Sequence, residues 1–409
     1  MTGAGAPAAS PPGRWRMLAW ICFAELGALS LWFSATAVIP ALRTAWMSTE
    51  AKAWLSMAVT LGFVVGTVAS AALTLADSVG ARRLFVISAV GGALVNASLL
   101  LVIDSLPAVL ACRFLTGVAM AGTYPPGMKL AASWFATDRG LAVGSLVGAL
   151  TLGGALPHLI NFLGGLAWPP VIAGTSLAAL GAALLVGTLV RDGPHILARS
   201  PFNPACLGEL VRSRGIVLAN LGYFGHMWEL YAMWTWIGLY LLEAFARAGV
   251  PAAPSLGPLA TAAVIAAGAV GSLAAGLLGD RMGRTATTML AMVASGTCAA
   301  LVGFVFDRPA LLVAVALVWG LTIVADSAQF SAAVTELAPP AYVGTALSLQ
   351  TSVGFLLTLG STWLVPRFAE AWGWPLAFLF LAPGPFLGTL AMWALRRLPE
   401  SVRLAHGRR

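Results

Sequence analysis

The sequence predicts an all-α membrane protein in which twelve transmembrane helices form two pseudo-symmetric bundles of six, with both termini in the cytoplasm. Of its 409 residues, 59% are hydrophobic, and the mean hydropathy is +0.89. Charged residues make up 9% of the chain, against roughly 25% in a soluble globular domain. The charge-free runs are long enough to cross a hydrocarbon layer of ~30 Å, which takes about 20 helical residues. No soluble core could bury this much apolar sequence.

Apolar runs bounded by charged residues, proline or glycine define the twelve spans. The first six lie near 16–42, 53–76, 83–103, 106–135, 140–162 and 167–190. The second six lie near 215–243, 257–278, 285–305, 309–336, 342–365 and 373–396. The first run lacks a signal-peptide cleavage pattern and is long enough to be retained as a span.

The regions outside the spans define the domain organisation. Residues 1–13, rich in Ala, Gly and Pro, are expected to form a disordered tail. The longest polar interruption, 191–214, contains three prolines and is predicted to be a cytoplasmic linker between six-helix bundles at 14–190 and 215–396. Residues 397–409 form a short basic C-terminal tail.

The distribution of the 23 basic residues predicts the orientation. Sixteen lie in loops or tails on one side of the spans, five on the other, and two within spans. Because cytoplasmic loops carry an excess of Lys and Arg, the richer side, which holds both termini, is expected in the cytoplasm. Anionic lipid headgroups are sufficient partners for the formal charge of +8, so no nucleic-acid partner is expected.

The two halves repeat residues at a nearly constant offset. The offset is 204 for Glu25 with Glu229 and Trp32 with Trp236, and 203 for Asp77 with Asp280, Gly80 with Gly283, and Gly117 with Gly320. Parallel six-helix repeats are a known transporter plan, with the substrate site between the halves near the membrane midplane.

Five ionisable side chains lie inside the predicted spans. They are Glu25 in the first span, Arg113 and Lys129 in the fourth, Glu229 in the seventh and Asp326 in the tenth. A charge at mid-bilayer costs several kcal/mol or more, so such residues usually face a bundle interior or a wet cavity. Every third helix is therefore expected to line a polar cavity, which is typical of a solute pathway.

A glycine-rich motif lies between the eighth and ninth spans, in the sequence GLLGDRMGR at 276–284. It resembles the loop signature G-x-L-x-D-R-x-G-R-R/K of the major facilitator superfamily. A partial copy, LADSVGARR at 75–83, follows the second span. The resemblance implies gating loops that contain Asp77, Gly80, Arg82 and Arg83 in the first half and Asp280, Arg281, Gly283 and Arg284 in the second.

Further motifs extend this resemblance to essentially the whole chain. Arg113-x-x-x-Gly117 is similar to the fourth-helix arginine motif of the superfamily. The family resemblance implies alternating access by rocking of two bundles, with helices one, four, seven and ten around a central cavity. The fifth span, however, has Ala149 where the antiporter signature has proline. Uptake symport and efflux antiport therefore both stay open.

Three carboxyl groups are predicted to couple transport to protons: Glu25, Glu229 and Asp326. A carboxyl in a low-dielectric cavity takes up a proton more readily than one in water. The alternatives are a structural hydrogen bond to a neighbouring helix or, for Asp326, an ion pair with Lys129 or Arg113. His226, three residues before Glu229, could modulate its proton, although a packed histidine is the simpler interpretation.

Candidate substrate-binding residues are Arg113, Lys129, Tyr231, Trp236 and Gln329. The two cations could hold an anionic group, and the two aromatic rings could stack on a substrate. The alternatives are a lysine that reaches the cytoplasmic interface, lipid-facing aromatic residues, and a glutamine in an interhelical hydrogen bond. His158 and Asn161 in the fifth span are expected near the outer interface, in contact with water.

Together, these features predict a proton-coupled secondary active transporter of a small polar organic solute in the cell inner membrane. Its expected partners are this solute, protons and membrane lipids, and it is expected to act as a monomer. A drug or metabolite efflux antiporter is the main alternative, and a membrane sensor without net flux is a remote one. No phosphate-binding loop, metal-ligand spacing or nucleophile–base pattern is present in the sequence, so no cofactor, metal or enzyme activity is expected.

Overall fold

The computed structural model describes residues 11–42, 44–135, 139–195 and 206–408, and within these ranges every regular element is a helix. The first half contains α1 (Arg14–Leu29), η1 (Thr36–Ala41), α2 (Thr49–Ala72), the π-helical turn η2 (Ala76–Gly80), α3 (Ala81–Val102), α4 (Leu106–Met120), α5 (Tyr124–Ala132), α6 (Arg139–Leu163) and α7 (Trp168–Thr188). The second half contains α8 (Leu207–Leu210), α9 (Arg214–Arg247), α10 (Ala253–Met282), α11 (Arg284–Leu301), η4 (Val302–Val305), α12 (Pro309–Ile323), α13 (Ser327–Leu337), η5 (Pro340–Tyr342), α14 (Val343–Trp372), η6 (Trp374–Leu376), η7 (Leu379–Leu381), α15 (Pro383–Arg397) and η8 (Pro399–Gly407).

Ten helical segments of the described residues are long and apolar enough to cross a membrane. They correspond to the second to sixth and the eighth to twelfth predicted spans. In the region of the first predicted span lie α1, which has 16 residues, and η1. In the region of the seventh lies α9, whose 34 residues include His226 and Glu229. The chain is therefore a multi-pass membrane protein.

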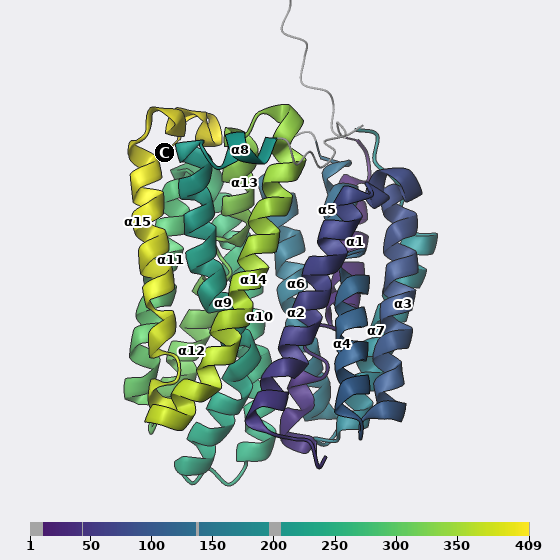
Figure 1. Cartoon of the computed structure of the whole chain (residues 1–409), viewed down its shortest axis with the longest axis vertical. Helices are drawn as coiled ribbons and strands as arrows, with labels where there is room; N and C mark the ends of the chain where they lie inside the picture. Colours follow the sequence, from purple (N-terminus) through teal and green to yellow (C-terminus); the bar gives the residue numbers. More distant parts are fainter. Residues whose placement is uncertain (1–10, 43, 136–138, 196–205, 409) are drawn as a thin grey trace, which may run out of the picture.

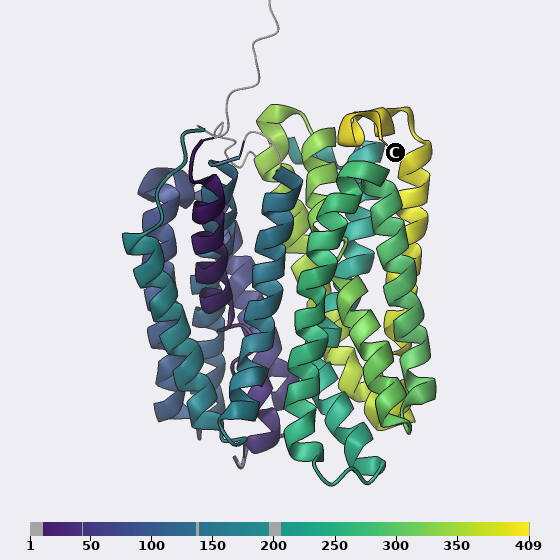
Figure 2. The ribbon, with the colours of Figure 1, turned by 180° about the vertical axis from the view of Figure 1, so that it is seen from behind.

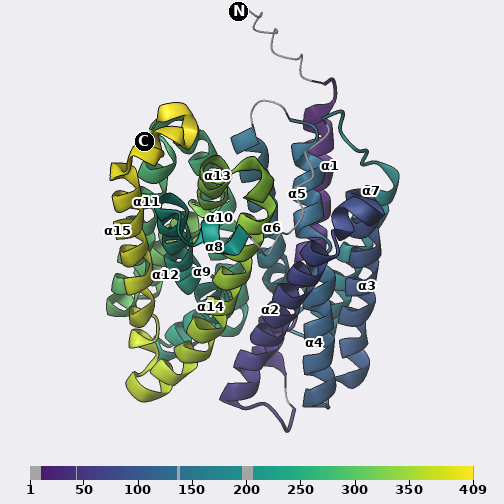
Figure 3. The same ribbon diagram turned by 45° about the horizontal axis from the view of Figure 1, so that its top comes forward.

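The helices lie side by side along the long axis of the molecule. Figure 1 shows α1 to α7 on one side and α9 to α15 on the other, and the view from behind in Figure 2 agrees. The two groups meet where α6 packs on α10 and α2 packs on α14. The start of α1 and the end of the chain lie at the same end of the molecule, here called the termini end (Figure 1, Figure 3). The opposite end is called the far end.

Glycines that repeat in the two halves bring helix backbones into direct contact. A Cβ atom added to Gly117 on α4 would lie 2.0 Å from the carbonyl oxygen of Val59 on α2. A Cβ atom added to Gly320 on α12 would lie 1.9 Å from the carbonyl oxygen of Val264 on α10. Only a residue without a side chain allows this approach, as in other close-packed membrane helices. The repeat of these glycines thus preserves the same helix contact in both halves.

Helix interruptions lie within the first, fourth and tenth predicted spans. The first stops at Leu29, the fourth divides into α4 and α5, and the tenth divides into α12 and α13. In the fourth, Pro125 and Pro126 at the start of α5 lack the N–H groups that a continuous helix needs. In the tenth, the carbonyl of Asp326 accepts a hydrogen bond from the N–H of Gln329, which starts a new helix. The prolines of the fourth span signal its break in the sequence, whereas the tenth span has no such signal.

The predicted basic tail is partly helical. Residues 399–407 form η8, which is attached to α13 by a hydrogen bond of 2.9 Å from the Ala405 N–H to Glu336 Oε2. Residues 1–10 of the predicted N-terminal tail and 196–205 of the predicted linker lie outside the described residues.

Candidate functional site

A cavity of about 480 Å³ lies between the two halves, and we call it the near cavity. Its lining comes from α1, α2, α5 and α6 on one side and α9, α13 and α14 on the other. It reaches Ala132 at the end of α5 and Gly344 at the start of α14, and so extends toward the termini end. This volume lies within the range of small-molecule sites, ~300–1,000 Å³.

Aromatic rings from both halves close the near cavity toward the far end. We call this cluster the aromatic floor: Trp32, Phe33, Phe63, Tyr231, Trp234 and Phe355. The Trp32 ring centroid lies 5.2 Å from that of Tyr231, and the Phe63 centroid lies 4.8 Å from that of Phe355. These distances are typical of favourable ring pairs. Tyr231, a predicted substrate-binding residue, thus faces the near cavity.

Lys129 is the charged side chain among the described residues that line the near cavity. Its Nζ atom lies 2.5 Å from Oδ1 of Asp77 on η2, and about a third of each side chain is exposed. Both residues belong to the predicted site, but Asp77 was expected in a separate gating loop. The structure instead joins the first loop motif to the cavity wall through this ion pair.

Arg113 does not line the near cavity, contrary to its predicted role in substrate binding. It is fully buried, and its guanidinium donates to the carbonyls of Leu31, Trp32 and Leu55 and to Ser34 Oγ. The first two carbonyls belong to the turn that follows α1. Arg113 therefore donates hydrogen bonds to backbone carbonyls of the turn at which the first span is interrupted.

Trp236 and Gln329 also lie outside the near cavity. Trp236 is buried in the second half and donates from Nε1 to the carbonyl of Thr362 at 2.9 Å. It is five residues from Tyr231, which is ~140° around a helix, so the two rings cannot share one face. Gln329 accepts a hydrogen bond from Arg284 Nη1 at 2.9 Å and donates to the Ala275 carbonyl, beneath the second loop motif. Neither side chain lines the near cavity, so neither is placed to contact a solute held there.

The symmetry-related glutamates lie in different environments. Glu25 is fully buried, and neither carboxyl oxygen has a hydrogen-bond partner among the described residues. It lies against Gly127 on α5, where a Cβ atom would be 1.7 Å from Glu25 Oε1. Glu229 instead accepts hydrogen bonds from Trp319 Nε1 at 2.7 Å and Ser295 Oγ at 2.9 Å. The sequence repeat preserves the residue, but its surroundings are not repeated.

A buried polar group connects the second half to the near cavity. His226 Nδ1 lies 2.9 Å from Asp326 Oδ1, and His226 Nε2 lies 2.8 Å from Ser327 Oγ. His226 and Asp326 are almost fully buried, whereas Ser327 lines the cavity. The sequence analysis paired His226 with Glu229 and missed the contact with Asp326. The available signal was the presence of both residues on spans expected to face the same cavity.

Each loop motif is attached to the helix that follows an interruption. In the first half, Asp77 pairs with Lys129 on α5. In the second half, Arg284 Nη1 lies 3.1 Å from Asp280 Oδ1, and its Nη2 lies 3.1 Å from Oε1 of Glu336 on α13. The two loops thus make equivalent attachments with different residues.

The remaining motif residues have more local roles. Gly80 and Gly283 have φ angles of +90° and +93°, which favour glycine at both turns. Arg82 donates from Nε to the Val186 carbonyl at the end of α7, at 3.1 Å. Arg83 and Arg281 are exposed.

Comparisons with known proteins agree with this architecture. The pattern of the Major Facilitator Superfamily matches residues 21–253 and 219–409. The inner membrane metabolite transport protein YhjE of Escherichia coli strain K12 is 26% identical over 214 residues. That match covers 48% of this chain and 49% of YhjE, about half the length of the relative.

Among solved structures, a crystal structure of a mutant of the nucleoside transporter NupG has a similar fold. The TM-score is 0.72 at 14% sequence identity, and the match covers 93% of this chain and 99% of that one. At this identity the similarity concerns the fold alone. With the family pattern matched over nearly the whole chain, this protein belongs to the major facilitator superfamily, a family of transporters.

Proposed function

We propose that this protein is a proton-coupled secondary active transporter of a small polar organic solute in the inner membrane, with twelve spans and the termini end in the cytoplasm. The observation that carries the proposal is the near cavity, which both halves line and which the aromatic floor closes on one side. A site between halves that faces one side of the membrane is what alternating access requires. Rocking of the halves would separate the floor rings and open the site to the other side.

The lining of the near cavity suits a solute that has both a ring and polar groups. Trp32, Tyr231 and Phe355 offer ring faces, Ser331 and Thr351 offer hydroxyl groups, and the Lys129 ammonium adds one cation. Stacking on aromatic rings contributes ~0.5–1.5 kcal/mol per pair beyond area burial. Nucleosides and other ring-containing metabolites meet this description. Efflux of a drug or metabolite is the second candidate, favoured by the apolar Met128, Met227 and Leu347 of the same lining.

The proposed coupling groups are Glu25, Asp326 with its neighbour His226, and Glu229. Burial of an isolated carboxylate costs far more than burial of a protonated carboxyl, and Glu25 has no hydrogen-bond partner among the described residues. Asp326 is linked to the cavity through His226 and Ser327. A proton that moves on or off these groups would therefore change the electrostatics of the cavity wall.

Transport assays in proteoliposomes test this function. The purified protein is reconstituted and offered labelled nucleosides, sugars and amino acids, with and without an imposed pH gradient. We expect flux of at least one ring-containing solute and an increase in that flux with the gradient. Flux that is indifferent to the gradient would contradict proton coupling. Growth of a deletion strain on the identified solute, or its sensitivity to it, separates uptake from efflux.

Matched variants identify the coupling groups. Glu25→Gln and Asp326→Asn are expected to abolish the response to the gradient while exchange of solute without a gradient continues. Asp307→Asn is the control, because Asp307 pairs with Arg247 on the exposed surface and lies outside the near cavity. A normal gradient response in both test variants would remove these carboxyls from the mechanism.

A further inference from the structure

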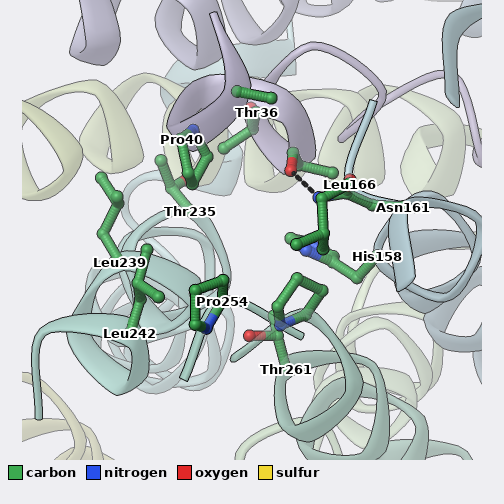
Figure 4. Close-up of a pocket in the computed structure, with 14 residues that line it drawn as sticks. Thr36, Pro40, His158, Asn161, Leu166, Thr235, Leu239, Leu242, Pro254 and Thr261 are labelled. Carbon is green, nitrogen blue, oxygen red and sulfur yellow. Dashed lines mark hydrogen bonds between the residues drawn. The ribbon is translucent and has the colours of Figure 1, made fainter. Parts of the chain in front are cut away.

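A second cavity of about 430 Å³ lies between the halves at the far end, and we call it the far cavity (Figure 4). It is lined by η1 and α6 of the first half and by α9 and α10 of the second. Neither the sequence motifs nor the transport function proposed above uses it.

The far cavity continues the path of the near cavity beyond the aromatic floor. Along the first segment, Trp32 lines the near cavity, and Thr36 lines the far one. Along α9, Tyr231 and Trp234 line the near cavity, and Thr235 lines the far one. Trp32 and Thr36, like Tyr231 and Thr235, are four residues apart, and Trp234 directly precedes Thr235, so the two cavities are adjacent on both segments. The floor rings form the partition between them.

Three buried polar side chains of the far cavity have atoms without hydrogen-bond partners among the described residues. They are Nε2 of His158, Oδ1 of Asn161 and Oγ1 of Thr36, on side chains that are 5%, 3% and 5% exposed. His158 and Asn161, expected near the outer interface, line this cavity at the far end with their side chains buried. Buried polar atoms are nearly always satisfied, so three unpartnered atoms around one cavity favour a polar occupant there.

The orientation of Asn161 favours an occupant that can donate a hydrogen bond. Asn161 donates from Nδ2 to the Ala37 carbonyl at 2.8 Å, as Figure 4 shows, which leaves Oδ1 as a free acceptor. Thr36 Oγ1 can donate or accept, and so can His158 Nε2 in its two tautomers. A hydroxyl group, which is both donor and acceptor, is complementary to all three atoms.

The remaining lining favours an uncharged occupant with an apolar side. Among the described residues that line the far cavity, none is Lys, Arg, Asp or Glu. Leu239, Leu242, Pro254 and Pro258 form an apolar wall. A charged solute would lose its hydration here without gaining a counter-charge.

We propose that the far cavity is a second binding station, on the far side of the aromatic floor, for an uncharged solute that carries hydroxyl groups. Its lining comes from both halves, so the station exists only while the halves keep this arrangement. The station requires neither proton coupling nor net flux. If the far cavity binds no solute, the transport function proposed above is unaffected. If that transport function is disproved, binding at the far cavity can still be observed.

A matched pair of threonines tests the station. Thr36→Val removes a hydroxyl with no partner, whereas Thr261→Val removes one that already donates to the Gly257 carbonyl at 2.8 Å, in the same cavity. Binding of glycerol, ribose, glucose, inositol and uridine to the purified full-length protein is measured by thermal shift and calorimetry. We expect at least one of these solutes to bind, about three- to tenfold more weakly to Thr36→Val and unchanged to Thr261→Val.

A second variant covers the case in which Thr36→Val does not fold. Gly238→Val inserts a side chain into the far cavity, where its Cβ atom would lie 3.4 Å or more from Thr261 and His158. It should abolish binding at this station, whereas Gly181→Val on α7, outside both cavities and with no atom within 4 Å of an added Cβ, should leave it unchanged. Binding that is insensitive to Thr36→Val and Gly238→Val would overturn the proposal. So would the absence of binding by all five solutes, which would mean that the cavity holds water alone.

Discussion

At the scale of single residues, the structure shows which of the charged residues in the predicted spans are bound within the protein and which line the near cavity. Arg113 was predicted to bind substrate, but all its hydrogen bonds go to the protein, including the turn that replaces the end of the first span. These hydrogen bonds attach α4 to the turn beside the aromatic floor. Lys129 keeps partial exposure and lines the near cavity, so it remains the candidate cation for substrate.

Arg113→Gln is expected to destabilise the folded protein strongly. The shorter amide cannot reach the same carbonyls, and each buried polar group left unsatisfied costs ~1–3 kcal/mol. Thermal unfolding of the purified protein in detergent measures the loss. Arg247→Gln is the control, because Arg247 pairs with Asp307 on the exposed surface. A variant at Arg113 with wild-type stability but no transport would restore the substrate-binding role.

Tyr231→Leu and Trp236→Leu separate a residue of the cavity from a residue of the core. Tyr231 lines the near cavity and contacts Trp32, whereas Trp236 packs inside the second half. Loss of ring stacking worth ~1.4 kcal/mol corresponds to about a tenfold increase in KM. We expect this increase for Tyr231→Leu, and a lower Tm with an unchanged KM for Trp236→Leu. Equal KM values in the two variants would place the solute elsewhere.

At the scale of elements, the interrupted helices position the site. The fourth and tenth spans both divide, and the helices that follow, α5 and α13, line the near cavity and receive the loop motifs through Lys129 and Glu336. Movement of a loop motif is therefore linked mechanically to the cavity wall. The break before α5 contains prolines, which the sequence shows, whereas the break before α13 contains none and has no such signal in the sequence.

The glycine contacts predict matched effects in the two halves. Gly117→Ala and Gly320→Ala should each lower Tm and folding yield, because the new Cβ would overlap a backbone carbonyl of the neighbouring helix. Gly181→Ala on α7 is the control, since its Cβ would meet no atom within 4 Å. Replacing glycine by alanine inside a helix without a clash is favourable by roughly 0.5–1 kcal/mol. Similar stability in all three variants would refute the close contacts.

At the scale of the whole molecule, two cavities and one aromatic floor define a path between the halves. Ser56 on α2 and Thr235 on α9 lie 3.0 Å apart at their hydroxyl oxygens, between the halves and beside the far cavity. A rocking motion that opens the far end must separate this pair. The distance between these two residues therefore reports the conformational state.

A Ser56→Cys/Thr235→Cys pair is expected to stop transport when it is oxidised. The four native cysteines, Cys22, Cys112, Cys206 and Cys298, are first replaced by alanine. A disulfide would hold the far end closed, so solute flux should vanish under oxidant and return with reductant. Each single cysteine variant is the control and should not respond to the oxidant. Full flux through the cross-linked protein would exclude alternating access at this interface.

The sequence by itself determined the membrane class, most helix positions, the repeat and the family. These features depend on hydrophobic runs and local motifs, which can be read along a single chain. Of the residues singled out in the sequence, Tyr231 and Lys129 line the near cavity, and Glu25 is fully buried.

Only the tertiary structure decided which polar groups meet. Three examples depend on residues tens of positions away in the sequence. Arg113 bonds to the turn after α1, and His226 contacts Asp326. Glu229 has hydrogen-bond donors, whereas Glu25 has none among the described residues. Glu25 and Glu229 are identical residues at symmetry-related positions, but they have different neighbours because the sequences around them differ between the two halves. The far cavity has no motif at all, since it is formed where four separate elements fail to fill the space between the halves.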